Sequence, residues 1–152
     1  MSFSVVVQTQ DFDVGREYAA LIADDKSAGA VVFFVGRVRD INAAQQVISM
    51  SLEHYPGMTE NILQQIIVEA KERWGLLAAR VVHRVGELHP GEQIVFVGVS
   101  SSHREQAFKA AEFLMDFLKT RAPFWKKEID SAGDEKWVEA KVIDTQRALR
   151  WE

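Results

Sequence analysis

The sequence predicts an α+β domain with a largely antiparallel sheet and three main helices. Short apolar or alternating segments, typical of strands, are separated by three longer segments whose apolar residues recur at helical spacing. The strand segments follow one another in pairs around turn residues, which favours antiparallel pairing. No repeat, low-complexity tract or linker interrupts the 152 residues, so we expect one domain spanning residues 1–152.

The N-terminal third of the chain predicts one helix among several strands. Residues 13–23 carry apolar side chains at helical spacing, and Asp13 is suited to cap that helix. Residues 29–40 begin as a continuous apolar run and then alternate, which predicts a strand that is buried at its start. Residues 41–46 predict a loop. The other strands predicted here are residues 3–8 and 47–55.

A second helix follows the turn that Pro56 and Gly57 predict. Thr59 is suited to cap it, and Glu60 in its first turn complements the helix dipole. Gly75 then ends this helix, because glycine readily adopts the left-handed conformation found after helices. Two strands, residues 79–85 and 93–100, are predicted next, on either side of a Pro-Gly turn.

The third helix, residues 102–121, has the clearest pattern in the chain. Ser102 and Glu105 match a capping box, in which each side chain bonds a free backbone N–H of the first turn. Pro123 prevents the helix from continuing. A hairpin of residues 124–129 and 136–142 is predicted after it, and residues 142–152 form a C-terminal tail.

Composition limits the possible functions. A net charge of −4 and a pI near 5.6 argue against general binding to nucleic acids or membrane surfaces. The absence of cysteine excludes disulfides, thiolate metal sites and a sulfur carried on this chain as a persulfide. No signal peptide pattern and no run of about 18 apolar residues occurs, so we expect a cytoplasmic protein without a membrane span.

The sequence also lacks the usual signatures of cofactor and metal sites. No P-loop and no GxGxxG dinucleotide motif is present, so no cofactor is expected. His54, His83 and His89 have no spacing that builds a metal site, so we interpret them as structural residues and predict no metal.

The first candidate for chemistry is a group of cations at the end of the third helix. Lys119 borders the apolar stripe of that helix, and the turn at Pro123 allows Lys126 to approach it. Two ammonium groups against aromatic surface would lower each other's pKa, which suits a general base, acid or nucleophile. The alternative is structural: Lys119 simply complements the helix dipole and extends to water.

Two further pairs of cations are candidates for anion binding. His103 and Arg104 begin the third helix, where free backbone N–H groups attract anions. Arg37 and Arg39 alternate with Val38 near the end of a predicted strand, so both would project from one sheet face. Either pair can instead be ordinary exposed surface.

Helix geometry separates these candidates within one chain. His103 and Lys119 are 16 positions apart on one predicted helix, and this places them about 24 Å apart along its axis. One small-molecule site therefore uses both only if a second copy of the chain brings the start of its helix to the end of the first. We favour such a dimer over two separate sites.

Five segments together resemble one known family, the catalytic (large) subunit of molybdopterin synthase. They are "FVGRVRD", "LEHYPGMTE", "HRVGELHPGE", "VFVGVSSSHREQAF" and "DFLKTRAPFWKKE". The resemblance extends from about Gly29 to Lys141, with the segments in the order of the family. It implies a fold of the α/β-hammerhead type and a homodimer of large subunits that binds a ubiquitin-like small subunit at each end.

The resemblance also implies an activity and a set of site residues. The small subunit carries sulfur as a C-terminal thiocarboxylate, and two sulfur transfers to cyclic pyranopterin monophosphate form the dithiolene of molybdopterin. Lys119 and Lys126 match the catalytic lysines of the family. The implied substrate-binding residues are Arg37, Val38, Arg39, His103, Arg104, Lys127 and Glu128. A further hypothesis is that the C-terminal tail reaches the site through Arg147 or Arg150.

Two other classes of function compete with this sulfurtransferase. The first is a non-catalytic module that binds the tail of a ubiquitin-like partner, and the presence of both Lys119 and Lys126 argues against it. The second is binding of RNA or nucleotides through the basic cluster. The net charge of −4 and the lack of a basic and aromatic stripe on a predicted sheet argue against that class.

Overall fold

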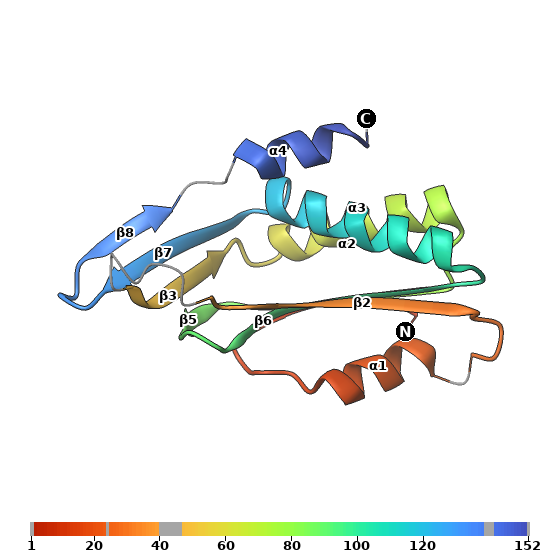
Figure 1. Ribbon diagram of the computed structural model, residues 1–152, viewed down its shortest axis with the longest axis horizontal. Helices are drawn as coiled ribbons and strands as arrows, with labels where there is room; N and C mark the ends of the chain where they lie inside the picture. Colours follow the sequence, from red (N-terminus) through yellow and green to blue (C-terminus); the bar gives the residue numbers. More distant parts are fainter. Residues whose placement is uncertain (1, 24, 40–46, 139–141, 152) are drawn as a thin grey trace.

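The computed structural model describes residues 2–23, 25–39, 47–138 and 142–151. Two four-stranded sheets and the helices packed on them form an α+β fold, as the sequence predicts (Figure 1). The loop predicted at residues 41–46 lies outside the described residues, as does the predicted end of the preceding strand at Asp40.

The first sheet has the strand order β1-β4-β6-β2. β1 and β4 are parallel, whereas β4–β6 and β6–β2 are antiparallel, so the prediction of largely antiparallel pairing is confirmed among the described strands. The strands are β1 (Phe3–Gln8), β2 (Ala30–Arg37), β4 (Ala78–Arg84) and β6 (Gln93–Ser101).

β2 differs from its prediction. Among the described residues, it lies at the edge of the sheet and pairs with β6 alone, so its first residues are half-buried rather than buried. Phe33 and Phe34 are each 43% exposed. The strand also ends at Arg37, after an irregularity in its pairing at Gly36, so Arg39 lies beyond the strand.

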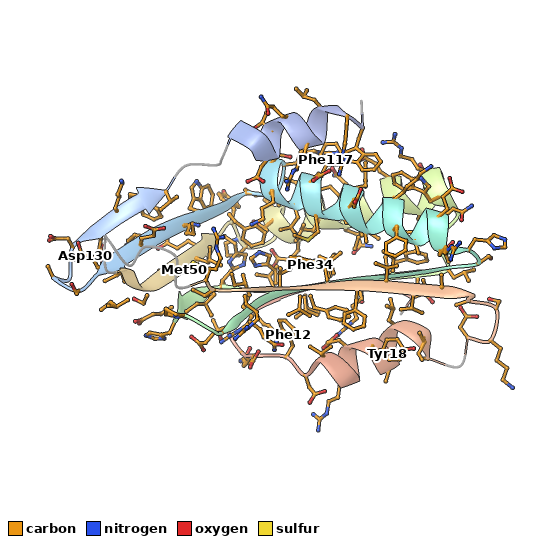
Figure 2. The ribbon with its side chains drawn as sticks, viewed as in Figure 1. Phe12, Tyr18, Phe34, Met50, Phe117 and Asp130 are labelled. Atoms are coloured by element: carbon orange, nitrogen blue, oxygen red, sulfur yellow. The ribbon has the colours of Figure 1, made fainter. Side chains whose placement is uncertain are left out.

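Helices cover both faces of the first sheet (Figure 1). α1 (Val14–Ile22) packs on one face, and α2 (Met58–Trp74) and α3 (Arg104–Thr120) pack on the other. Phe12 and Tyr18 lie on the α1 side, whereas Phe117 lies on the α3 side (Figure 2). The central strand β6 consequently serves two cores, with Val97 facing α2 and α3 and Phe96 facing α1.

The second sheet has the order β5-β3-β7-β8, with every pair antiparallel. Its strands are β3 (Val47–His54), β5 (Gly86–Leu88), β7 (Phe124–Asp130) and β8 (Glu135–Val138). The sequence did not predict β5, which is only three residues long and is stabilised by pairing with β3. Figure 1 shows this sheet extending past the C-terminal end of α3.

The predicted caps of two helices are wrong, whereas Asp13 caps α1 as predicted by accepting from the Arg16 N–H. Strand β6 ends at Ser101, and the chain is still extended at His103, so α3 begins at Arg104 and Ser102 makes no capping box. Gly57, with φ of +85°, lets α2 begin at Met58. Thr59 therefore lies inside the first turn, where its side chain makes longer-range contacts.

A fourth helix, α4 (Val142–Leu149), was not predicted. It lies against α3 on the side away from the first sheet (Figure 1). Buried Asp116 on α3 holds it in place, accepting from Arg150 Nη2 at 2.8 Å and from Trp151 Nε1 at 2.6 Å. The strand predicted to reach residue 142 ends at Val138, and residues 139–141 lie outside the described residues. No helix in the described residues is long and apolar enough to cross a membrane.

Candidate active site

The two candidate lysines face a common space where the two sheets meet. Lys119 comes from the last turn of α3, and Lys126 comes from β7, which starts directly after Pro123. Both line a cavity of about 280 Å³ and an adjoining cavity of about 230 Å³. Met50 on β3 (Figure 2) and Ile94 on β6 also line both cavities, so the two spaces adjoin along these four residues.

The cavity of about 280 Å³, called here the inner cavity, has mostly apolar walls. Its apolar lining is Met50, Leu52, Ile94, Leu118, Ala122, Phe124 and Val138. Its polar and charged groups are Lys119, Lys126, His83 and Asp144. Apolar walls with a few charged groups are typical of sites that remove a ligand from water and orient it.

The cavity of about 230 Å³, called here the outer cavity, is more strongly cationic. Arg37, Val38 and Arg39 line it together with both lysines, and Glu128 is the carboxylate in its wall. Among the described residues, four cations and one carboxylate line this cavity and give it a local positive charge, although the chain is acidic overall. Such a cavity favours an anionic ligand.

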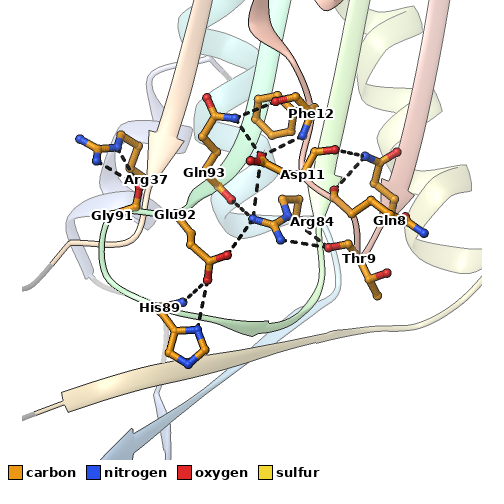
Figure 3. Close-up of polar contacts among 11 residues, drawn as sticks. Gln8, Thr9, Asp11, Phe12, Arg37, Arg84, His89, Gly91, Glu92 and Gln93 are labelled. Atoms are coloured by element: carbon orange, nitrogen blue, oxygen red, sulfur yellow. Dashed lines mark hydrogen bonds and ion pairs between the residues drawn. The ribbon is translucent and has the colours of Figure 1, made fainter.

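Arg37 is fixed by the turn that precedes β6. Its Nε and Nη2 donate to the Gly91 carbonyl at 3.2 and 3.0 Å (Figure 3). Buried Arg84 stabilises the base of the same turn, because Nη1 donates to the Gln93 carbonyl and lies 3.7 Å from Glu92 (Figure 3). A guanidinium has five N–H donors, so Arg37 keeps others for a ligand.

The junction between α3 and β7 is anchored by α2. Thr59, which is fully buried, donates from its hydroxyl to the Pro123 carbonyl at 3.1 Å and accepts from the Tyr55 N–H at 2.9 Å. The segments "LEHYPGMTE" and "LKTRAPFWK" are therefore in direct contact at the point from which Lys126 is presented.

Lys127 is not part of either cavity. Successive residues of a strand point to opposite sheet faces, and Lys127 points away from Lys126. Its ammonium pairs with Glu135 at 3.2 Å and lies 4.9 Å from the centre of the Trp137 ring. These contacts support a role in holding the β7–β8 hairpin, so substrate binding by Lys127 stays an unsupported prediction.

His103 and Arg104 are also apart from the lysines within one chain. Both are exposed, and α3 continues without a break from Arg104 to Thr120. The full length of the helix therefore separates them from Lys119, in agreement with the estimate of about 24 Å. Neither residue lines the cavities that contain Lys119 and Lys126.

His83 is a site residue that the sequence interpretation treated as structural only. It is 5% exposed and lines the inner cavity beside Lys119. Its pKa is lowered from 6.5 to about 4: burial is the main cause, Lys119 and His54 add to it, and the hydrogen bond to the Arg84 carbonyl opposes it. The alternation of β4 offered a signal, because His83 shares a face with Val81, which packs towards α2 and α3.

The C-terminal helix α4 also reaches this region. Asp144 lines the inner cavity, and it lines a wider hollow of about 620 Å³ together with Lys119, Arg147 and Arg150. Among the described residues, neither arginine lines the inner or the outer cavity, and Arg150 binds Asp116, so the hypothesis that the tail reaches the site through them stays a prediction. No group of three or more potential metal ligands occurs among the described residues.

Comparisons with known proteins decide the family. Residues 7–121, well over half of the chain, match the family described as MoaE protein. The chain belongs to the MoaE protein family. It is 54% identical, over the full length of both chains, to the molybdopterin synthase catalytic subunit of Vibrio cholerae.

Solved structures of MoaE relatives share this fold. A molybdopterin cofactor biosynthesis protein E from Burkholderia multivorans superposes with a TM-score of 0.84 at 48% identity, covering 99% of this chain and 97% of the other. Molybdopterin synthase from Staphylococcus aureus superposes with a TM-score of 0.80 at 32% identity, covering 91% and 98%. The mixed fold of two antiparallel-rich sheets is therefore that of the MoaE family.

Proposed function

We propose that this protein is the catalytic subunit of a molybdopterin synthase and acts as a sulfurtransferase. In this reaction, a ubiquitin-like small subunit delivers sulfur as a C-terminal thiocarboxylate. Two transfers to cyclic pyranopterin monophosphate form the dithiolene of molybdopterin. In each transfer the thiocarboxylate sulfur bonds to a pterin carbon, whose oxygen substituent leaves. Water then adds to the acyl carbon and breaks its bond to sulfur, so the small subunit leaves with an ordinary carboxylate.

The observation that carries this proposal is the pair of adjoining cavities around Lys119 and Lys126. The apolar inner cavity suits a thin peptide tail, and the cationic outer cavity suits a phosphate-bearing pterin. Full-length identity of 54% to a named catalytic subunit supports the same activity. The chain contains no cysteine, so a partner has to supply the sulfur.

Lys119 and Lys126 take the chemical roles in this proposal. An ammonium beside the acyl group stabilises the negative charge that develops on its oxygen when water adds to the carbon, before the sulfur leaves. The same groups can give or accept protons as the pterin carbon bonds to sulfur. Arg37 and Arg39 hold the phosphate, Val38 packs beside it, and Glu128 orients the cations around it.

Binding of the small subunit and of a second large subunit completes the proposed assembly. β2 has a free edge in the described structure, and Phe33, Phe34 and Phe108 expose large apolar surfaces near it. A dimer formed on this side would cover them. It would also bring His103 and Arg104 of the second copy to the lysines of the first. We place the reaction in the cytoplasm.

The decisive assay mixes the purified protein with thiocarboxylated small subunit and cyclic pyranopterin monophosphate. Formation of molybdopterin, measured through its fluorescent oxidation product, is the expected result. A small subunit that ends in an ordinary carboxylate is the matched control and gives no product. If the protein binds the small subunit but forms no product, it is a non-catalytic binding module and the proposal is wrong.

Mixed dimers test the proposed sharing of the site. Lys119→Ala and Arg104→Ala are each expected to be inactive as pure dimers, because every site lacks one group. After the two variants are unfolded and refolded together, one site of each mixed dimer is intact. Random assortment would restore about a quarter of the wild-type activity. No recovery, with mixed dimers shown to be present, would contradict the shared site.

A further inference from the structure

The ring of His83 is held in one orientation at the wall of the inner cavity. It stacks on Phe124, with ring centroids 3.9 Å apart and an interplanar angle of 17°. Its Nδ1 lies 2.8 Å from the backbone carbonyl of Arg84. A carbonyl oxygen only accepts hydrogen bonds, so Nδ1 carries the hydrogen, and Nε2 of the neutral ring has a free lone pair.

Among the described residues, the hydrogen bond of the ring uses Nδ1, and Nε2 is not one of the fully enclosed unpaired atoms, so Nε2 is open to the cavity. The side chain is 5% exposed, and it lines the cavity that contains Lys119 and Lys126. Water in the cavity can satisfy this acceptor, but a ligand that displaces the water leaves it unpaired unless another donor replaces the water. An acceptor in the cavity wall therefore favours a donor that approaches it when the site is filled.

We propose that His83 is a positioning residue for Lys119, whose ammonium donates a hydrogen bond to Nε2 once ligands fill the inner cavity. This inference rests on the proposed sulfurtransferase function. The long, flexible side chain of Lys119 is exposed to water, although Phe117 and Leu118 beside it in the last turn of α3 are buried. Ligands that displace this water leave the ammonium in need of a new acceptor.

Lys119 is close enough to His83 for its charge to be among the causes that lower the pKa of the imidazole. A neutral acceptor has an advantage over a carboxylate such as Asp144. It fixes the direction of the ammonium without cancelling its charge, so the full charge stays available to the thiocarboxylate.

His83 does not act as a general base in this role. With a pKa of about 4, the imidazole stays neutral near pH 7. The ring therefore orients a proton donor rather than removing its proton.

Three substitutions of His83 distinguish the effect of the Nε2 acceptor from the effects of the rest of the imidazole ring. His83→Phe keeps the stacked ring and removes both nitrogens, and His83→Asn keeps a donor for the Arg84 carbonyl but lacks the distal acceptor. His83→Gln places a carbonyl oxygen near the position of Nε2. We expect His83→Phe and His83→Asn to lower kcat by about 10- to 100-fold, since a misplaced catalytic group has effects of that size.

The kinetic constants of these variants distinguish a positioning role of His83 from a structural role and from direct contact with a substrate. KM for both substrates should stay within about threefold, and His83→Gln should recover a large part of kcat, because only the distal acceptor is restored. Equal kcat losses in His83→Gln and His83→Phe, with similar unfolding midpoints, would overturn the inference. So would a rise in KM for the small subunit at unchanged kcat, which would place the ring against the tail.

If the His83 variants fail to fold, a spectroscopic measurement that keeps His83 in place still tests the inference. In protein with ¹⁵N-labelled histidine, the Nε2 resonance of His83 should move upfield when the small subunit binds, because its lone pair then accepts a hydrogen bond. The same experiment on Lys119→Ala should show no such shift. A shift that persists in Lys119→Ala would overturn the inference. Absence of product from the wild-type protein would instead refute the proposed function. The NMR measurement requires no turnover, so the two failures can be told apart.

Discussion

The first sheet is covered by helices on both faces, whereas the second sheet has only a small core of its own. In the first, side chains such as Phe96 and Val97 on β6 are fully buried on opposite faces. In the second, the buried cluster contains Val38, Met50, Leu52, Val85 and Leu88. Large side chains of that sheet, including Trp125 and Trp137, remain about half exposed.

The core of the first sheet therefore supplies most of the stability, whereas the candidate site lies where the first sheet meets the second. The two-sided core of the first sheet fixes β4, β6 and α3, which carry His83, Ile94 and Lys119. The second sheet then supplies Lys126 and the more open wall of the cavities. A site at the junction is rigid on one side and accessible on the other, as binding of a large partner requires.

The strongest test of this division is Lys119→Ala. We expect activity to fall by at least about 100-fold, because general acid–base and electrostatic roles have effects of this size. The unfolding midpoint should change little, since the Lys119 side chain is exposed. The matched control is Lys109→Ala on the same helix, which removes only a surface pair with Glu105 and should retain full activity.

Lys119→Ala would support a structural role instead if its melting temperature fell sharply while activity per folded molecule persisted. Thermal unfolding and product formation measured on the same samples give both quantities.

Phe96→Ala should have the opposite profile. Phe96 is fully buried beneath α1, where it packs against Phe12 and Phe33, so its truncation leaves a cavity in the two-sided core. We expect a loss of about 3–5 kcal/mol in the free energy of unfolding.

Met50→Ala, in the smaller cluster of the second sheet, should lower the free energy of unfolding by about 2 kcal/mol. Urea unfolding monitored by fluorescence would measure both, and equal losses would contradict the proposed difference between the sheets.

The pH dependence of stability tests the burial of His83. The unfolded chain binds a proton at this imidazole near pH 6.5, whereas the folded protein binds it only near pH 4. Between these values the unfolded state holds more protons, so stability falls as the pH is lowered from 6.5 to 4. The shift corresponds to about 3 kcal/mol.

His83→Phe removes this contribution, so the free energy of unfolding of that variant should fall less between pH 7 and pH 4.5 than that of the wild type. Equal pH-dependent losses in the two proteins would show that another group is responsible.

The smallest expected effect concerns the contact that joins α2 to the start of β7. Thr59→Val keeps the shape of the side chain but removes the donor to the Pro123 carbonyl and the acceptor for the Tyr55 N–H. We expect a loss of about 1–3 kcal/mol in the free energy of unfolding, because buried groups are left unpaired. Thr59→Ser retains the hydroxyl and is the control. Similar losses in both variants would assign the effect to packing.

The sequence alone determined most of the secondary structure and the location of the cationic cluster. Local signals sufficed where they were strong, as with the capping by Asp13, the left-handed Gly75 that ends α2, and the helical spacing that puts Lys119 beside buried Leu118. Local signals predicted the wrong residue where pairing with a neighbouring strand fixed the position of a helix start. Pairing of β6 with β2 delays the start of α3, so His103 replaces the predicted capping residue Ser102.

Only the tertiary structure decided which residues share the cavities. Lys126 and Lys127 are adjacent and alike in sequence, and the sheet directs one into the cavities and the other onto Trp137. In the sequence, His83 has no partner at a recognisable spacing. In the structure, it stacks on Phe124 and lines the inner cavity together with Lys119. The physical reason is that spacing along the chain fixes the face on which a residue lies, whereas sheet pairing and helix docking fix what that face meets.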